Sequence, residues 1–167
     1  LKSFMHDVLN EYSMSDILLA RTEVAAEYVI DNERRIDIVI QNPRFFIPIE
    51  VKIYAGEQEG QCYDYYQYAK NSRLVYLTRF GNAPSEYSRK EKSGTGILPI
   101  DRIQCISWTE DICGWLNILT AQLAEPVKST VMQYIDAIHV MADERNGKIM
   151  EKIWKYYMSH LIIFVRE

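Results

Sequence analysis

The sequence predicts an α/β or α+β domain with a helical C-terminal cover, and two observations carry this prediction. Short apolar runs rich in Ile, Val and Phe alternate with helical patterns up to about residue 108, and helical patterns alone follow. The 167 residues, 48% hydrophobic and 25% charged, suit one soluble globular domain with a sizeable core. We therefore predict a single domain, 1–167, with its core at about 1–108 and its cover at about 109–167.

Periodicity and turn residues predict the elements of the core. Apolar residues at helical spacing predict a first helix over about 4–12. A second helix over 58–71 follows a polar bend, and a long polar loop occupies 81–96. The Asn42-Pro43 pair breaks the chain between two strands. Runs of β-branched and aromatic residues place the strands at 23–30, 35–40, 45–54, 73–80 and 103–108.

The cover is predicted as three helices. A capping box opens the first, with Ser107 as the cap and Glu110 reaching back to it. Pro126 opens the second helix. Apolar stripes mark the faces that pack on the core: Ile112, Trp115, Leu116 and Leu119 on the first helix, Val127, Val131, Ile135 and Ile138 on the second, and Ile149, Ile153, Trp154 and Tyr157 on the last.

Composition argues against several classes of protein. A net charge of −4 does not suit a surface coated in positive charge for nucleic acid, although a local basic face is compatible with it. The longest apolar run, Leu161–Val165, is too short to span a membrane, and no signal peptide is visible. Cys62, Cys105 and Cys113 form no C-x-x-C motif, which argues against a disulfide framework or a zinc site. We therefore expect a cytoplasmic protein.

Charged residues interrupt two of the predicted strands. Side chains alternate across a strand, so Glu50 and Lys52 share a face. We pair the strands as a hairpin in which Ile40 faces Ile47. Three positions further along, Asp37 then faces Glu50, with Cβ atoms roughly 5 Å apart on one side of the sheet. Two carboxylates so placed repel each other, so either this register is wrong or a positive group lies between them.

A divalent cation is one such group. Mg²⁺ prefers hard oxygen ligands and usually takes one or two carboxylates. Asp37, Glu50 and the backbone carbonyl of Val51 would supply them, with the Lys52 ammonium beside the metal to hold a water or a phosphate oxygen. The alternative is an ordinary ion pair at a sheet edge, which Pro48 in the same strand favours. Spacing alone leaves both interpretations open.

The Tyr-rich helix that follows supports the metal interpretation. Gln61 and Tyr65 are four residues apart and so lie on one face of that helix, which begins directly beyond Lys52. Its N-terminus would point free N–H groups and the positive end of its dipole at the acidic cluster and at any phosphate. The alternative is that the tyrosines only pack on the sheet, and we prefer this alternative for Tyr66 and Tyr68.

Together these residues resemble a known family. Asp37, then Glu50-x-Lys52, then Gln61-x-x-x-Tyr65 resembles the PD-(D/E)xK nuclease superfamily, within it the RecB-type and lambda-exonuclease-type branch with its Q-x-x-x-Y helix, and most closely a bacterial family of that superfamily. The resemblance covers about 24–138 and is strongest over 35–69.

The resemblance implies a restriction-endonuclease-like core of helix, three antiparallel strands, helix and strand, with helices on both faces of a mixed sheet. It also implies hydrolysis of nucleic-acid phosphodiesters with Mg²⁺, for which Mn²⁺ would substitute. Carried over residue by residue, Asp37 and Glu50 would ligate the metal, Lys52 would be the catalytic lysine, Gln61 would support the site and Tyr65 would line it.

The chain departs from the family pattern at two points. Ile36 stands where the superfamily's proline would precede the first acid, which is common in this branch. The family also carries an acidic residue on its first helix, and the resemblance places that residue before Leu1. Glu11 and Glu27 are the possible substitutes within the chain, although an exposed surface charge is the more ordinary interpretation of either.

Basic residues in and beside the long polar loop are candidates for contact with a nucleic-acid backbone, and such contact would weaken with salt. The alternative, at equal weight, is a solvated surface loop. The residues are Arg79, Arg89, Lys90 and Lys92.

Three functions remain open at this point. The first is a metal-dependent nuclease acting on nucleic acid, with DNA preferred over RNA. The second is an inactive module of the same fold that binds nucleic acid or a partner protein. The third is a structural domain that dimerises through its C-terminal helices, although an aromatic stripe is more often core; the stripe comprises Trp115, Trp154, Tyr156 and Tyr157.

Overall fold

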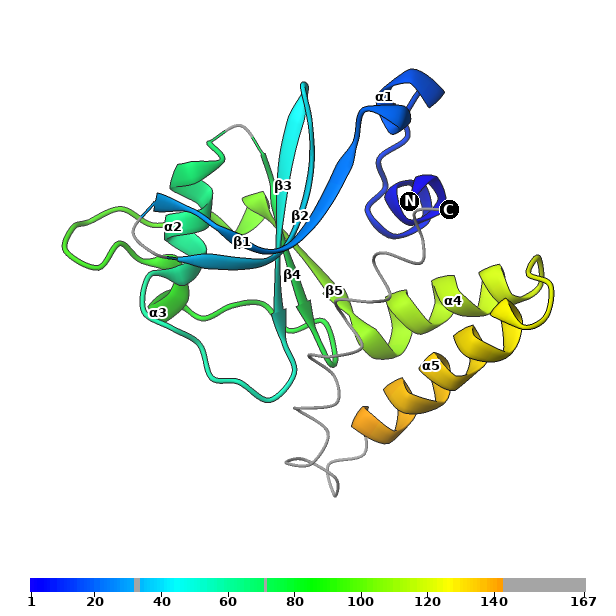
Figure 1. Ribbon diagram of the computed structural model, residues 1–167. Helices are drawn as coiled ribbons and strands as arrows, with labels where there is room; N and C mark the ends of the chain where they lie inside the picture. The colour runs from blue at the N-terminus through cyan, green and yellow to red at the C-terminus, as the bar shows by residue number, and fades with distance from the viewer. Residues whose placement is uncertain (32–33, 71, 143–167) are drawn as a thin grey trace.

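The computed structural model describes residues 1–31, 34–70 and 72–142, and within them five strands form one mixed sheet (Figure 1). Strands β1, β2 and β3 are antiparallel neighbours, and β4 and β5 continue the sheet parallel to β3. This is the mixed sheet that the sequence predicts. The strands, in sheet order, are β1 (Glu23–Val29), β2 (Arg35–Asn42), β3 (Phe45–Lys52), β4 (Leu74–Thr78) and β5 (Ile103–Ser107).

Helices flank the sheet on its two sides, which gives the domain its α/β layers. Helix α2 (Gln61–Tyr68) packs on one face together with the short α3 (Glu86–Arg89), while α4 (Cys113–Thr120) and α5 (Val127–Ala142) pack beside each other on the other side (Figure 1). The predicted stripes of α4 and α5 are confirmed at most positions, since the buried residues of these helices include Trp115, Leu116, Ile135 and Ile138, while Val127 is only half-buried.

Two apolar clusters hold these layers together, one on each side of the sheet. Ile38, Ile40, Ile47, Ile49 and Val75 lie on the α4–α5 side. The cluster on the α2 side is smaller, and its strand residues are Ile36, Val39, Leu74 and Tyr76, which pack against Cys62 and Tyr65 of α2.

The hairpin between β2 and β3 is closed by its own turn residues. The Asn42 side-chain oxygen accepts hydrogen bonds from the backbone N–H groups of Arg44 (2.8 Å) and Phe45 (3.1 Å). Such a side-chain turn, together with Pro43, ends one strand and starts the next. Strand β2 therefore runs to Asn42, two residues beyond the predicted end.

The N-terminal region differs from the prediction. A helix over about 4–12 is expected, but only a π-helical turn over Phe4–Val8 forms, because Asn10 adopts a left-handed backbone with φ 55°. A second short helix, α1 (Asp16–Ala20), was not predicted. Ser15 starts it by accepting a hydrogen bond from the Leu18 N–H (3.3 Å).

The cap that opens the helical cover is also different from the predicted box. Ser107 Oγ accepts the N–H groups of Glu110 (3.1 Å) and Asp111 (3.2 Å), as a cap does. The side chain that reaches back is Asp111, which accepts the Ser107 N–H at 2.7 Å, and not Glu110. The first turn, Trp108–Ile112, is π-helical and so holds more residues per turn, which moves the reciprocating position one residue along.

The long loop after β4 is more ordered than predicted. It contains α3, and a bridge pairs Lys90 with Ile97. The last predicted helix and three of the four aromatic residues proposed for a dimer face lie outside the described residues. The fourth, Trp115, is core, and its Nε1 donates to Ser3 Oγ at 2.8 Å, so it is not part of a free face. Among the described residues, no helix combines the length and the apolar character that crossing a bilayer requires.

Candidate active site

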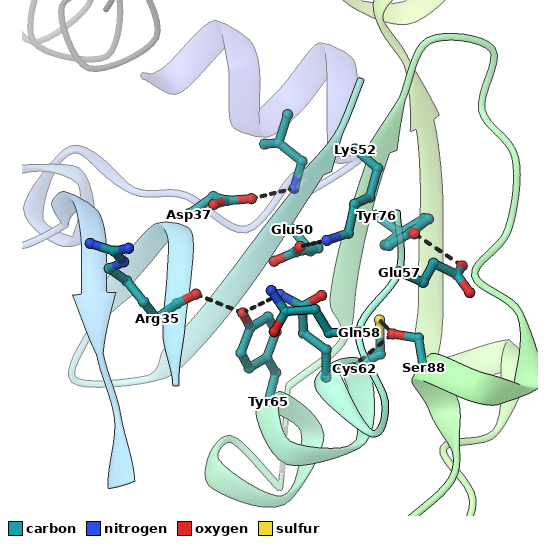
Figure 2. A network of polar contacts seen from close by, with 12 residues as sticks. Arg35, Asp37, Glu50, Lys52, Glu57, Gln58, Cys62, Tyr65, Tyr76 and Ser88 are labelled. Atoms are coloured by element: carbon teal, nitrogen blue, oxygen red, sulfur yellow. Dashed lines mark hydrogen bonds and ion pairs between the residues drawn. The ribbon is translucent and has the colours of Figure 1, made fainter. Parts of the chain in front are cut away.

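The predicted register of β2 and β3 holds along the hairpin. Ile40 pairs with Ile47 and Ile38 with Ile49, and the paired ladder stops there, one position before Asp37. Beyond it, Asp37 Oδ2 accepts a hydrogen bond from the backbone N–H of Val51 at 2.8 Å. The Asp37 carboxylate thus contacts β3 at the residue next to Glu50, the second acid (Figure 2).

Glu50 is the most deeply buried charged group of the candidate site. Its side chain is 2% exposed, and its Oε1 lies 2.7 Å from the Nζ of Lys52, whose side chain is 10% exposed. The two side chains are on one strand and one face, as their spacing predicts. Figure 2 shows the Asp37 and Glu50 carboxyl groups and the Lys52 ammonium brought together at this point.

The second oxygen of Glu50 has no such neighbour. Oε2 is buried and has no hydrogen-bond partner among the residues that the structure describes. Burial, helped by the nearby Asp37 carboxylate, raises the pKa of Glu50 to about 7, although the Lys52 ammonium and the Tyr65 hydroxyl partly offset this rise. A buried acceptor that lacks a partner is costly, and a cation bound to it would remove that cost.

Gln61 and Tyr65 lie on one face of α2 as predicted, and they contact each other. Gln61 Nε2 donates to the Tyr65 hydroxyl at 2.9 Å, and that hydroxyl donates to the backbone carbonyl of Arg35 at 2.7 Å (Figure 2). Tyr65 is fully buried, and burial raises its pKa. It therefore ties α2 to the start of β2, two residues before Asp37. Its hydroxyl also acts on the Glu50 carboxyl, and the role of Tyr65 in lining the site stays a prediction.

The N-terminus of α2 is not free, contrary to the prediction. The Gly60 N–H donates to the Tyr87 carbonyl (3.0 Å), the Gln61 N–H donates within the preceding turn, and the Cys62 N–H donates to Ser88 Oγ (3.3 Å). Helix α3 supplies the acceptors for Gly60 and Cys62, and the preceding turn supplies the one for Gln61, so these donors are not left for a phosphate. Because α3 is 26 residues away along the chain from Cys62, periodicity near α2 does not reveal it.

Two further side chains fix the loop between β3 and α2, and the sequence analysis missed both. Glu57 accepts hydrogen bonds from the Tyr76 hydroxyl (3.2 Å) and from the Ser85 N–H (2.8 Å) and also binds the Ser85 hydroxyl. Arg34 is an almost buried donor whose guanidinium binds Asp64 Oδ2 at 2.8 Å, Gln58 Oε1 at 2.8 Å and the Glu59 carbonyl. Their partners are distant in sequence, so no local spacing signals them.

The two residues predicted as substitutes for the family's first-helix acid have other partners. The Glu27 carboxylate forms an exposed ion pair with Arg35 at 2.7 Å, from a left-handed residue with φ 54°. The Glu11 carboxylate binds the Ser13 hydroxyl and N–H within the N-terminal segment. Across residues 1–31, 34–70 and 72–142, no group of three or more His, Cys, Asp or Glu side chains is arranged to hold a metal ion. Within the described residues, the two carboxylates that the structure brings together at this site are those of Asp37 and Glu50.

The three basic residues of the loop differ in their contacts and in their exposure. Lys90 forms an exposed ion pair with Glu86 at 2.8 Å, and half-buried Arg89 binds the Leu98 carbonyl at 3.1 Å, which closes its own hairpin. Lys92 is exposed, and its stem packs at Gly60, where an added Cβ would lie 3.1 Å from Lys92 Cγ. The Lys90 backbone carbonyl lies beside the same position, so the structure puts the Lys92 stem and the Lys90 backbone next to the start of α2.

Arg79 lies at the end of β4, one residue after Thr78. In the parallel register Thr78 pairs with Lys52, so Arg79 follows the strand end next to the candidate site. Its guanidinium lies over two aromatic rings and donates to the Met141 carbonyl at 3.5 Å. The structure thus brings Arg79 to the same edge of the sheet as Lys52.

The residues present fit a divalent cation. Two carboxylates and one backbone carbonyl are hard oxygen donors of the kind that Mg²⁺ takes, with waters and substrate oxygens completing its shell. The buried Glu50 Oε2 without a partner is the observation that supports this fit. No donor in this set is a thiolate or an imidazole, which zinc would favour.

Comparison with known proteins gives one match. The model of a family described as the PD-(D/E)XK nuclease superfamily matches residues 1–153, which is most of the chain. Searches of curated proteins and of solved structures found no match.

Proposed function

Because the chain belongs to the PD-(D/E)XK nuclease superfamily, we propose that it is a Mg²⁺-dependent nuclease that hydrolyses phosphodiester bonds of DNA. The observation that carries the proposal is the buried Glu50 carboxyl, with one oxygen bound to Lys52 at 2.7 Å and the other without a partner among the described residues. Mn²⁺ is expected to substitute for Mg²⁺.

Asp37, Glu50 and the Val51 carbonyl would hold the cation. When bound, it would lower the pKa of a water and offset charge on the phosphate. Ionised Glu50 is needed for this, and its pKa of about 7 makes ionisation sensitive to pH near neutrality. The hydrogen bond from the Val51 N–H orients Asp37 for the same task.

Lys52 would act on the reacting groups. Its ammonium is almost buried and is held 2.7 Å from Glu50, so it can donate to an attacking water or to a phosphate oxygen at the same place. A positive charge there would stabilise the negative charge that develops on the phosphate during hydrolysis.

Gln61 and Tyr65 would position the site. The Tyr65 hydroxyl holds the Arg35 carbonyl, which fixes the strand that carries Asp37. Gln61 holds that hydroxyl through Nε2, while its own Oε1 is buried without a partner in the part of the chain that is described, and so can accept a hydrogen bond from a water or a substrate group. Arg79, Lys90 and Lys92 would contact the nucleic-acid backbone, which makes binding salt-dependent.

A cleavage assay on two matched lysine variants tests the proposal. We expect Lys52→Ala to reduce Mg²⁺-dependent cleavage of plasmid and oligonucleotide DNA by roughly 10²- to 10⁴-fold, because it removes a proton donor at the reacting phosphate. Lys2→Ala is the control: Lys2 also lies 2.7 Å from a carboxylate, that of Asp16, but on the exposed surface. Equal activity in the two variants, or cleavage that persists in EDTA, would contradict the proposal.

An inactive binding module is the second candidate, and the two-carboxylate site is the observation that favours it. Under this alternative the wild-type protein binds DNA but leaves it intact with either Mg²⁺ or Mn²⁺. Gel-shift and cleavage assays on the same preparation separate the two candidates, because the nuclease proposal requires cleavage that the module does not show.

A further inference from the structure

Two aromatic side chains flank Arg79 where β3 and β4 end. Lys52 and Thr78 are paired in the parallel register, and Tyr54 and Phe80 each follow two residues later. Parallel strands run in the same direction, so both rings lie beyond the same edge of the sheet, the edge at which Lys52 ends β3. At roughly 3.3 Å per residue, two residues carry the chain only a short way past the candidate site.

The contacts at this edge hold the guanidinium in place. The Arg79 guanidinium carbon lies 5.2 Å from the centre of the Tyr54 ring and 5.4 Å from the centre of the Phe80 ring. The Tyr54 hydroxyl (3.2 Å) and Arg79 Nη1 (3.5 Å) both donate to the Met141 carbonyl near the end of α5. Arg79 and Tyr54 are therefore anchored from outside the site.

Phe80 is the exposed member of this group. Its side chain is 52% exposed, whereas Tyr54 is half-buried and packs against the core of the α4–α5 side. An exposed aromatic residue alone carries no meaning, because apolar atoms make up much of every protein surface. Here the ring lies beside a fixed guanidinium, two residues past the strand position that pairs with Lys52. An aromatic face and a cation close to the strand end that carries the proposed phosphate site are a combination that suits a nucleic-acid strand.

We propose that Phe80, supported by Arg79, is a stacking site for an unpaired nucleobase of a single strand whose phosphate lies at Lys52. This inference rests on the proposed function and deepens it by assigning the substrate class. Every base offers a π face, and stacking on an aromatic side chain next to a cation holds a single strand without reading its sequence. In a duplex those faces are covered by neighbouring bases, so the site selects unpaired strands or ends over blunt duplex.

A binding assay in EDTA tests the inference apart from catalysis. Fluorescence anisotropy would compare labelled oligo(dT) and oligo(U) of about 20 nucleotides with a blunt duplex of equal length, since a stacked site of this kind spans several nucleotides. We expect Phe80→Ala to weaken single-strand binding by roughly 5- to 100-fold, and Phe80→Trp to retain it. Tyr12→Ala is the matched control, because Tyr12 is 68% exposed and lies in the N-terminal segment.

Three results would overturn the stacking site: Phe80→Ala binding the single strands as tightly as wild type, an equal loss of affinity for the duplex, or a wild-type protein with no preference for single strands. A preference for oligo(dT) over oligo(U) at a site that still depends on Phe80 would support DNA as the strand, and the reverse preference would support RNA. Cleavage by wild type with Mg²⁺ is measured on the same samples. If the wild type cleaves but Phe80→Ala binds single strands normally, the stacking site is wrong and the nuclease proposal stands. If Phe80→Ala loses single-strand binding but the wild type does not cleave, the stacking site stands and the nuclease proposal is wrong.

Discussion

The two faces of the sheet are built on different principles. The side toward α4 and α5 is a continuous cluster of Ile, Val, Leu, Met and Trp side chains. The side toward α2 has a smaller apolar cluster and buries Glu50 and Gln61 next to it, each with an oxygen that lacks a hydrogen-bond partner among the described residues. Burying such groups is unfavourable, so the second face gives up stability at the point where function is proposed. The apolar face therefore stabilises the fold, whereas the buried polar groups of the α2 face lower its stability.

The largest stability effect is expected on the apolar face. Leu116 of α4 is 1% exposed, so Leu116→Ala should lower the free energy of unfolding by about 2–5 kcal/mol through lost burial and a residual cavity. Ile118→Ala on the same helix should change it by less than about 0.5 kcal/mol, since Ile118 is 58% exposed. Urea unfolding measures both. A loss of Mg²⁺ affinity in folded Leu116→Ala would break the separation of the two faces.

On the α2 face, replacing a buried residue should raise the free energy of unfolding, which is the opposite of the effect expected for Leu116. The pKa of Glu50 is about 7 in the folded protein, above its ordinary value of 4.5, so between these values the folded state holds more protons than the unfolded state. Stability therefore falls as the pH rises from about 4.5 to about 7. Glu50→Gln mimics the protonated form and should raise the free energy of unfolding at pH 8 in EDTA by up to about 3 kcal/mol, a gain that shrinks to below about 1 kcal/mol at pH 5.

The control for this prediction is Glu86→Gln. Glu86 is exposed and paired with Lys90, and its pKa is lowered by that lysine, so its replacement should bring no gain in stability. Thermal melts at the two pH values, with and without Mg²⁺, provide the measurement. We also expect Mg²⁺ to stabilise the wild type at pH 8 and to lose this effect in Glu50→Gln. Destabilisation of Glu50→Gln at pH 8 would mean that the ionised carboxylate is well satisfied and that the faces do not differ as described.

The smallest effect concerns the start of the helical cover. Ser107→Ala should destabilise the protein by about 1 kcal/mol, because it removes the acceptor for two backbone N–H groups. Asp111→Ala should have a similar effect, and Glu110→Ala should have almost none. Thermal unfolding measures these changes. An equal loss of stability in the Asp111 and Glu110 variants would contradict the observed cap and support the predicted box, in which Glu110 reaches back to Ser107.

The fold was largely predictable because local sequence patterns indicate most of its helices and strands. The strands β1, β3, β4 and β5 and the helices α2, α4 and α5 lie within the regions that periodicity and turn residues predict, and β2 runs two residues further. The exceptions are short. The first helix stops at a left-handed Asn10, and α3 has only four residues within a polar loop, too few for a periodic pattern.

The candidate site was predictable in part, for a similar reason. Strand alternation puts Glu50 and Lys52 on one face, and the hairpin register, which can be worked out from spacing, brings Asp37 close to them. The ladder itself ends at Ile38 and Ile49, and Asp37 joins β3 through the Val51 N–H. The partners of the α2 N-terminus and of Glu57 could not be, because α3 and Ser85 reach them from more than twenty residues away. The catalytic and metal-binding roles of these residues stay predictions for the experiments above.

By itself, the sequence determined the order of the elements, the alternation that puts Glu50 and Lys52 on one face, and the hairpin that sets Asp37 near them. Only the tertiary structure decided how deeply Glu50 is buried, that α3 occupies the donors of α2, and that Arg79 lies between Tyr54 and Phe80. The physical reason is the distance along the chain over which each property is set. Periodicity encodes which way a side chain points within its own element, whereas burial, pKa and contacts between elements depend on packing that no local pattern contains.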